Sequence, residues 1–417
     1  MANVTTSVGG TPASSPDDVT INCDMLSDAH ARPIKGIAWD EGTRSNQGHL
    51  YFEDGHGNDV FLQFHGVHPD IVLGNSDNSN DYRAAVVYIL RVNATTSYPM
   101  IDFYDLTGLG TTGFTATHTG TLQLSTTNLG IIYDTDPIPH IDMWSDDTPG
   151  AQINGYPAMR EFAVSWNEGN DVHYNWGRIG SGTVYLPLST FPNGDKVNQS
   201  PTHRTYNDVA CYTDVSTGQK LAVFCYNEWP NGLVVYELDF TIASPTATFS
   251  TTTNFWQGVT FPRIEAMSQY DPSNFAAPWD VVASRGTSCW EYNIVSFGTD
   301  ISTTLLAGGH FMSTAIAAGI GNVVGEPTIG NIQFTPGYLE WWGTTAPPLT
   351  TSINYYARAV DPVTGSVIDP DYYIINTNPV AGQPTYSGAD VSKGLTLSNS
   401  SNSGDYLLSV WYNDANG

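Results

Sequence analysis

Two histidines in this sequence each stand two residues before an aspartate, at His68-Pro69-Asp70 and at His140-Ile141-Asp142. An imidazole beside a carboxylate can transfer protons to or from a substrate, or it can bind a metal ion. In an enzyme, the catalytic candidates are therefore His68, Asp70, His140 and Asp142. The structural alternative is that these residues cap strand ends and hydrogen-bond between neighbouring units of the fold.

Similar polar groups begin the next two apolar segments of the chain. His203 precedes Asp208, and Arg263 precedes Glu265. If these segments occupy equivalent places in a repeated fold, their polar side chains converge at one mouth of a central channel. The predicted ligand-binding set is then His68, Asp70, His140, Asp142, His203, Asp208, Arg263 and Glu265.

Carboxylates of this set would also suit glycoside hydrolysis, which needs two carboxyl groups about 5–10 Å apart. The candidates are Asp70, Asp142, Asp208 and Glu265. Because the chain contains 41 acidic residues, carboxylates also come close by chance, and the sequence leaves their separation open.

One tryptophan is expected in a loop, where its ring could stack on the apolar face of a sugar. This is Trp256, in Asn254-Phe255-Trp256-Gln257-Gly258. Most of the other aromatic residues are expected to pack between sheets. Trp256 therefore joins the predicted ligand-binding set.

Loops rich in Asp, Asn and Gly make calcium the one cofactor that the sequence suggests, since Ca²⁺ prefers oxygen ligands. The loops match no EF-hand spacing, and the same residues are common in turns without any ion. The predicted metal ligands are Asp54, Asn58, Asp59, Asp77 and Asp81.

Charge narrows the range of partners. Lys and Arg total 14 against 41 Asp and Glu, which gives a formal net charge of −27. Nucleic acid is an improbable partner because phosphate binding needs clustered cations, and anionic membrane surfaces are disfavoured for the same reason. No apolar run is long enough for a transmembrane helix. A glycan or a protein is the expected ligand.

The wider composition favours an extracellular or surface location. Only 13% of residues are charged, aromatic residues reach 12%, and polar turn formers are abundant. The N-terminal residues contain no apolar core of a signal peptide. Residues 1–33 are expected to form a polar tail that could mediate self-assembly by adding a strand to a neighbouring copy.

An internal repeat determines where these candidates lie. Each copy begins at a Pro or Gly, continues to a very apolar run after about 17–25 residues, and then turns into a Tyr-rich strand. The apolar runs include Ala84–Leu90, Phe162–Trp166 and Leu221–Tyr226. They lack alternation, which is typical of strands buried on both faces. The copies start near residues 69, 139, 201, 262, 327 and 388.

Units of about 60–70 residues with four strands resemble the blades of the β-propeller superfold. The sixth copy is short, and residues 34–68 would supply the strands that it lacks. The sequence therefore predicts an all-β, six-bladed β-propeller over residues 34–417 whose N- and C-terminal strands share the closing blade. Five or seven blades remain alternatives. The signatures of WD40 repeats and of sialidase Asp-boxes are absent.

Two function classes follow from this fold and these residues. The favoured one is a non-catalytic surface module for binding, adhesion or assembly, with a glycan as a possible ligand. The alternative is a glycan-active enzyme, a hydrolase or lyase, with acids and histidines at the channel mouth. Cys211 and Cys225 end two apolar runs around a short turn, so a disulfide between them and two buried thiols are both open.

Overall fold

The computed structural model describes the chain in segments, and every regular element of those segments is a β-strand. The described residues are 20–28, 32–41, 46–75, 82–130, 138–146, 158–179, 184–185, 194–197, 203–229, 232–241, 245–253, 260–266, 269–270, 278–285, 288–293, 323–331, 338–345, 353–360, 367–374, 389–391, 395–398, 403–406 and 408–411.

Two four-stranded antiparallel sheets begin the fold, and each uses four consecutive strands. The first contains β1 (Ile21–Ser27), β2 (Pro33–Asp40), β3 (Gly48–Glu53) and β4 (Asp59–Phe64) in that order. The second contains β5 (Val67–Asn75), β6 (Tyr82–Asn93), β7 (Thr96–Thr107) and β8 (Thr115–Gln123).

The next two sheets repeat this order and each adds one short strand. The third contains β9 (His140–Asp146), β10 (Ala158–Glu168), β11 (Asp171–Ile179) and β12 (Val184–Tyr185), with β13 (Asp195–Lys196) on β11. The fourth contains β14 (His203–Asp214), β15 (Gln219–Trp229), β16 (Gly232–Asp239) and β17 (Thr246–Thr253), with β19 (Gln269–Tyr270) on β14.

The C-terminal part continues with smaller sheets. One contains β18 (Thr260–Ala266), β20 (Trp279–Arg285) and β21 (Ser288–Asn293). A four-stranded sheet contains β22 (Val323–Asn331), β23 (Tyr338–Thr345), β24 (Ile353–Val360) and β25 (Val367–Ile374). Two strand pairs follow: β26 (Ala389–Val391) with β29 (Ser409–Trp411), and β27 (Leu395–Ser398) with β28 (Ser403–Tyr406).

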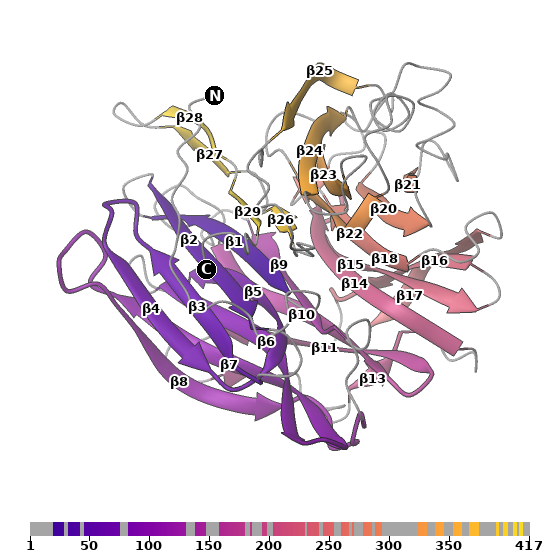
Figure 1. The fold of residues 1–417 in the computed structure, drawn as a ribbon, viewed down its shortest axis with the longest axis horizontal. Coiled ribbons are helices and arrows are strands. Elements are labelled where there is room, and N and C mark those ends of the chain that lie inside the picture. Colours follow the sequence, from indigo (N-terminus) through magenta and orange to yellow (C-terminus); the bar gives the residue numbers. More distant parts are fainter. Residues whose placement is uncertain are drawn as a thin grey trace.

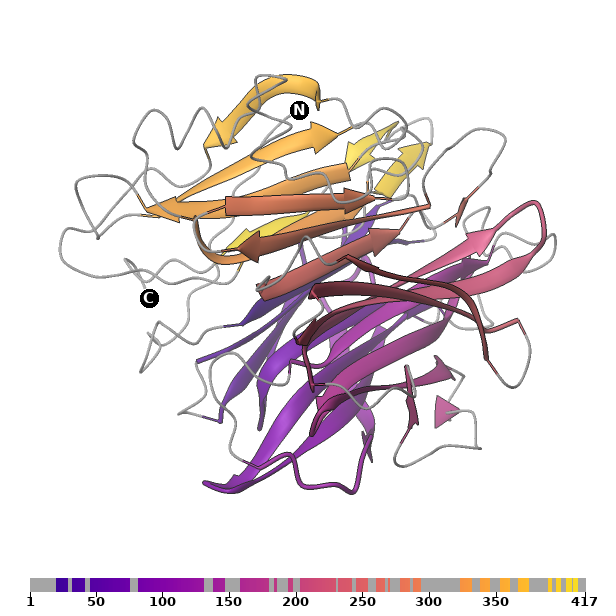
Figure 2. The same ribbon diagram turned by 90° about the vertical axis from the view of Figure 1, so that its right-hand side faces the viewer.

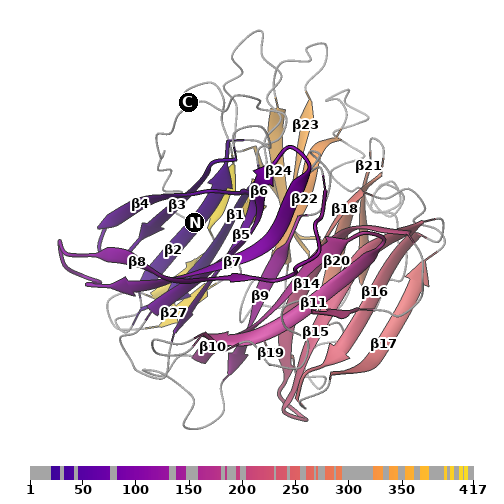
Figure 3. The ribbon, with the colours of Figure 1, turned by 90° about the horizontal axis from the view of Figure 1, so that it is seen from below.

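The first strands of successive sheets contact one another in chain order, from β1 through β5, β9, β14, β18 and β22 to β26, and β26 also contacts β1. The last strands lie at the periphery, with β8 and β17 on opposite sides of the view in Figure 1. Figures 2 and 3 show the sheets fanning out from this shared interior. Antiparallel sheets that radiate from contacting first strands are the architecture of a β-propeller.

The apolar second strands are buried on both faces, as their sequence predicts. On β6, Ala84 and Val86 belong to a cluster shared with Phe52 of the first sheet. The alternating residues Ala85 and Val87 belong to a different cluster, shared with Phe162 of the third sheet. Each sheet is therefore packed on both sides, and a second strand needs apolar side chains at every position.

Each of the six expected unit starts falls in a first strand or within two residues of one. The expected closing blade is wrong for the described residues. Residues 34–64 do not pair with the C-terminal strands; they form β2, β3 and β4 on β1. The boundary expected at residue 34 thus falls inside the first sheet, because residues 21–27 of the expected tail are β1.

An aspartate in the first strand links four sheets to the next first strand in the series. One carboxylate oxygen accepts the N–H of the following residue, and the other accepts an N–H from the next sheet. The cross-sheet bonds are Leu73 N to Asp24 Oδ2 (2.6 Å), Ile141 N to Asp70 Oδ2 (3.0 Å), Cys211 N to Asp142 Oδ2 (2.6 Å) and Ile264 N to Asp208 Oδ2 (2.8 Å). The local bonds come from Met25, Ile71, Met143 and Val209, at 2.7–2.8 Å. We call these four residues the bridging aspartates.

Replacing a bridging aspartate should destabilise the fold, and Asp142→Asn is the cleanest test. An amide offers one acceptor oxygen, so one of the two backbone N–H groups then faces an NH2 donor. We expect a loss of about 1–3 kcal/mol in the free energy of unfolding, measured by urea denaturation. Asp195→Asn is the matched control, since Asp195 is exposed and accepts only the N–H of Lys196. Equal losses in both variants would contradict a cross-sheet role.

Candidate functional site

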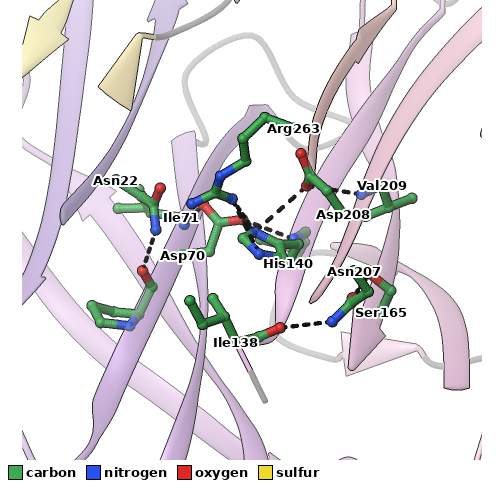
Figure 4. A network of polar contacts seen from close by, with 12 residues as sticks. Asn22, Asp70, Ile71, Ile138, His140, Ser165, Asn207, Asp208, Val209 and Arg263 are labelled. Atoms are coloured by element: carbon green, nitrogen blue, oxygen red, sulfur yellow. Dashed lines mark hydrogen bonds and ion pairs between the residues drawn. The ribbon is translucent and has the colours of Figure 1, made fainter. Parts of the chain in front are cut away.

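A cluster of four charged or titratable side chains lies where four first strands meet (Figure 4). Asp70 comes from β5, His140 from β9, Asp208 from β14 and Arg263 from β18. Four consecutive sheets thus contribute one group each from their first strands. We call these four residues the axial cluster.

His140 is the centre of the axial cluster. Its Nδ1 lies 3.3 Å from Asp70 Oδ2 and 3.5 Å from Asp208 Oδ1. The Arg263 Nη1 lies 2.6 Å from Nδ1 and 3.1 Å from Nε2 of the same ring. Because a guanidinium can only donate, a hydrogen bond from Arg263 requires an unprotonated nitrogen on the imidazole.

The side chains of the axial cluster are largely buried, and burial shifts the pKa values of its carboxyl groups. His140 retains 3% of its side-chain exposure, Asp208 10% and Asp70 14%. Burial raises the pKa of Asp70 to about 6, although the N–H of Ile141 and the charge of Arg263 oppose the shift. Burial likewise raises the pKa of Asp208, against the opposing charges of His140 and Arg263. Near neutral pH the cluster therefore holds a carboxyl group that takes up a proton readily.

The chemical capacity of the cluster is limited by what its oxygens already bind. Asp70 and Asp208 are both bridging aspartates, so their oxygens accept two backbone N–H groups each. The arrangement suits a structural ion cluster at least as well as general acid–base work.

The remaining residues of the predicted set separate into two groups. Asp142 is a bridging aspartate, and Glu265 is buried and accepts the N–H of Ala266. His68 lies in another environment, with Nδ1 2.8 Å from Thr20 Oγ1 and its backbone N–H donated to Asp40. His203 begins β14. The structure thus brings together His140, Asp70, Asp208 and Arg263, and it keeps His68 on a separate hydrogen-bond network.

The two His-x-Asp motifs differ for a local reason. The register of β5 shifts between Val67 and Asp70, and His68 has a positive φ of 53°. This bulge turns the His68 backbone N–H toward Asp40, whose other oxygen accepts the N–H of Thr20. His140 lies in a regular strand, opposite Ser165.

The predicted calcium loop is an Asp-centred turn. Asp54 accepts hydrogen bonds from the backbone N–H groups of His56, Asn58 and Gly110 and from the side chain of Asn58. Asp59 is exposed on β4. Within the described part of the chain, no group of three or more His, Cys, Asp or Glu residues is arranged to hold a metal ion. Asp77, Asp81 and Trp256 lie outside the described residues.

Cys211 and Cys225 are both buried free thiols. Their strands pair, but Cys211 stands opposite Ala222 and Cys225 opposite Asp208. Burial raises the pKa of the Cys225 thiol well above its usual value. Of the two alternatives that the sequence left open, the structure has the buried thiols.

Two polar or aromatic groups were not singled out from the sequence. Asn207 joins Ser165, Asn167 and the carbonyl of Ile138 beneath the axial cluster (Figure 4). Trp39, His49 and Phe61 gather on one face of the first sheet, with ring centroids 5.2–5.7 Å apart. The register of their three strands places these residues on one face of the sheet. The sequence alone does not reveal that register.

Comparison with known proteins gives structural matches alone. No protein-family model matches the chain. No curated protein matches it either. A fucose-specific lectin from Aleuria aurantia is similar at 9% identity and a TM-score of 0.42, over 84% of this chain and 94% of that chain. An α-L-arabinofuranosidase from Fusarium graminearum is similar at 8% identity and a TM-score of 0.41, over 85% and 95%. A Trypanosoma rangeli sialidase is similar at 8% identity and a TM-score of 0.37, over 82% and 52%.

Among the described residues, no helix is long and apolar enough to cross a membrane.

The raised pKa of Asp70 predicts a specific pH dependence. Between the unfolded value of 3.8 and about 6, the folded state binds more protons than the unfolded state, so this contribution to stability falls as pH rises. The free energy of unfolding of the wild type, minus that of Asp70→Asn, should decrease by about 2 kcal/mol from pH 4 to pH 7. Urea denaturation at several pH values measures this difference.

Asp54→Asn provides a control of opposite sign. Burial of Asp54 favours its neutral form, but the hydrogen bonds from Asn58, Gly110 and His56 outweigh this effect and hold its pKa below the usual value. Its stabilising contribution is therefore present above the unfolded pKa and is lost as pH falls. The wild-type minus Asp54→Asn difference should rise with pH. Parallel slopes for the two variants would contradict the assignment of Asp70.

Removing the cation of the axial cluster should be costly. Arg263→Met leaves two buried carboxyl groups without their guanidinium, and we expect a loss of about 3–5 kcal/mol in the free energy of unfolding. Adding Asp208→Asn should recover part of this loss because it removes one uncompensated charge. A double-mutant cycle by urea denaturation measures the coupling, and simple additivity would contradict it.

Proposed function

We propose that this protein is a non-catalytic binding module built on a β-propeller scaffold. The observation that supports this most strongly is the use of its axial acids. Asp70, Asp142 and Asp208, which would have to act as catalytic carboxylates, each accept one backbone N–H of their own strand and one from the next first strand. A carboxylate that reacts with substrate would have to give up these bonds.

We further propose that the scaffold has seven blades. The seven first strands from β1 to β26 support this count, and the contact between β1 and β26 supports closure by packing. Val410, beside β26, packs in a cluster with Ile21 and Cys23 of β1. On this proposal the ring closes between the first and the last blade, without a sheet built from both termini.

A neutral glycan is the proposed ligand, and the proposed contact surface is the aromatic cluster of the first sheet. Phe61 is 42% exposed, the highest value among its aromatic neighbours, and it lies 5.4 Å from the His49 ring. His49 Nε2 lies 2.9 Å from Glu41 Oε1, so a carboxylate borders the rings. An exposed ring beside a carboxylate suits a sugar, which presents an apolar face and hydroxyl donors. The net charge of −27 disfavours acidic sugars.

A glycan-active enzyme is the second candidate. The specific observation in its favour is Asp70, whose pKa of about 6 and contact with His140 suit a general acid. The bridging bonds of Asp70 count against it. The expected extracellular location and calcium binding stay predictions.

A glycan array combined with hydrolysis assays tests the proposal. The wild type should bind at least one neutral oligosaccharide, and Phe61→Ala should weaken that binding about tenfold by removing a stacking surface worth about 1.4 kcal/mol. Val92→Ala is the matched control, since Val92 is 57% exposed and belongs to the second sheet. Absence of neutral-glycan binding would overturn the ligand assignment. The non-catalytic assignment would be overturned if the wild type hydrolysed the bound sugar and His140→Ala did not.

A further inference from the structure

The outermost strand of the second sheet, β8, is an edge without charged residues or proline. Among the described strands, it is hydrogen-bonded only to β7. Thr115, Thr117, His118, Thr119 and Thr121 are exposed along it. An exposed edge presents free backbone N–H and C=O groups to another strand.

Four of the other outermost strands carry features that discourage such pairing. Asp59 lies in β4 and Glu291 lies in β21. The strand β25 contains Asp369-Pro370-Asp371, and β12 is only two residues long. Charges, proline and short length all block addition of a strand. By contrast, β8 contains no acid, lysine, arginine or proline, and β17 shares this property.

The side chains of β8 hold its backbone in place on the sheet. Thr121 Oγ1 donates to Asp102 Oδ1 at 2.5 Å, and Thr119 Oγ1 donates to the Phe103 carbonyl at 3.1 Å. A bulge at Thr119 interrupts the register with β7. The regular part that remains available is Thr115–His118, which begins the strand.

The partner that fits this edge is the same strand of a second copy, because threonines favour cross-strand pairing and the strand carries no acid, lysine or arginine. A chain of net charge −27 repels a second copy over most of its surface. The uncharged β8 edge is a place where two copies can approach without bringing like charges together. Two identical strands that pair antiparallel are related by a two-fold axis, which gives a closed dimer.

We propose that β8 is a homodimer interface at which Thr115–His118 of two copies pair as antiparallel strands. The second sheets of the two copies then form one continuous sheet. In this register Thr115 of one copy faces His118 of the other, and Ala116 faces Thr117. The short paired segment makes the dimer weak and dependent on concentration. Screening by salt strengthens it because the two copies repel elsewhere.

Light scattering after size-exclusion chromatography, run over a range of concentrations, tests the proposal. The wild type should shift from the mass of one chain toward twice that mass as concentration rises, and more so at high salt. Thr117→Lys should raise the dissociation constant at least about tenfold, because it adds two like charges to the short paired segment and a lysine on an edge strand opposes addition of another strand. Val215→Lys is the matched control, since it makes the same charge change at a 47% exposed residue in a turn.

A third variant identifies the edge that is used. Ser250→Lys changes β17, the other uncharged outer strand, and should leave the dimer intact. Unchanged unfolding midpoints show that each variant is folded. A wild type that stays monomeric throughout overturns the proposal, as does an equal effect of Thr117→Lys and Val215→Lys. Loss of the dimer in Ser250→Lys would instead assign the contact to β17.

Discussion

The bridging aspartate is the interaction on which the rest of this structure depends. First strands of neighbouring sheets contact one another without forming a ladder, so backbone N–H groups between them need other acceptors. A carboxylate has two oxygens and can accept an N–H from its own strand and another from the next sheet. Asp24, Asp70, Asp142 and Asp208 each do this. The same residue type therefore recurs at the start of successive units for a structural reason.

Burying these carboxylates costs free energy, and the axial cluster offsets part of that cost. Isolated buried charges are costly, and the raised pKa values of Asp70 and Asp208 reflect that cost. Arg263 extends from β18 and His140 from β9, which places a guanidinium and an imidazole beside the two acids. Asp142 and Asp24 lie outside this cluster, and each accepts the corresponding pair of backbone N–H groups. The cluster is thus a local consequence of the bridging pattern, and its pH response follows from the same burial.

The sequence predicts the repeating part of the fold well and its irregular parts poorly. Largely apolar runs such as Phe162–Trp166 predict second strands, because strands buried on both faces lack the alternation of apolar and polar residues. The first strand β1 was missed since Ile21–Ser27 mixes Asn22 and Asp24 with apolar residues and lies next to a polar tail. Because the sequence does not predict β1, residues 34–68 have no first strand of their own in the predicted fold. They are therefore assigned to the closing blade. The register shift at His68 is also invisible in sequence, so the two His-x-Asp motifs looked equivalent.

Because the axial side chains link the sheets, the outer strands are the better candidates for contact with other molecules. At the periphery, the exposed side chains of the outer strands are free of packing between sheets. The axial acids are occupied by backbone N–H groups, and their buried positions leave little surface for a ligand. The outer strands differ from one another much more than the first strands do. In the first sheet β4 carries the exposed ring of Phe61, in the second β8 carries a row of threonines, and in β25 acids flank a proline. The interior residues of this scaffold are fixed by the links between its sheets. Differences between one sheet and the next can therefore occur in the outer strands without breaking those links.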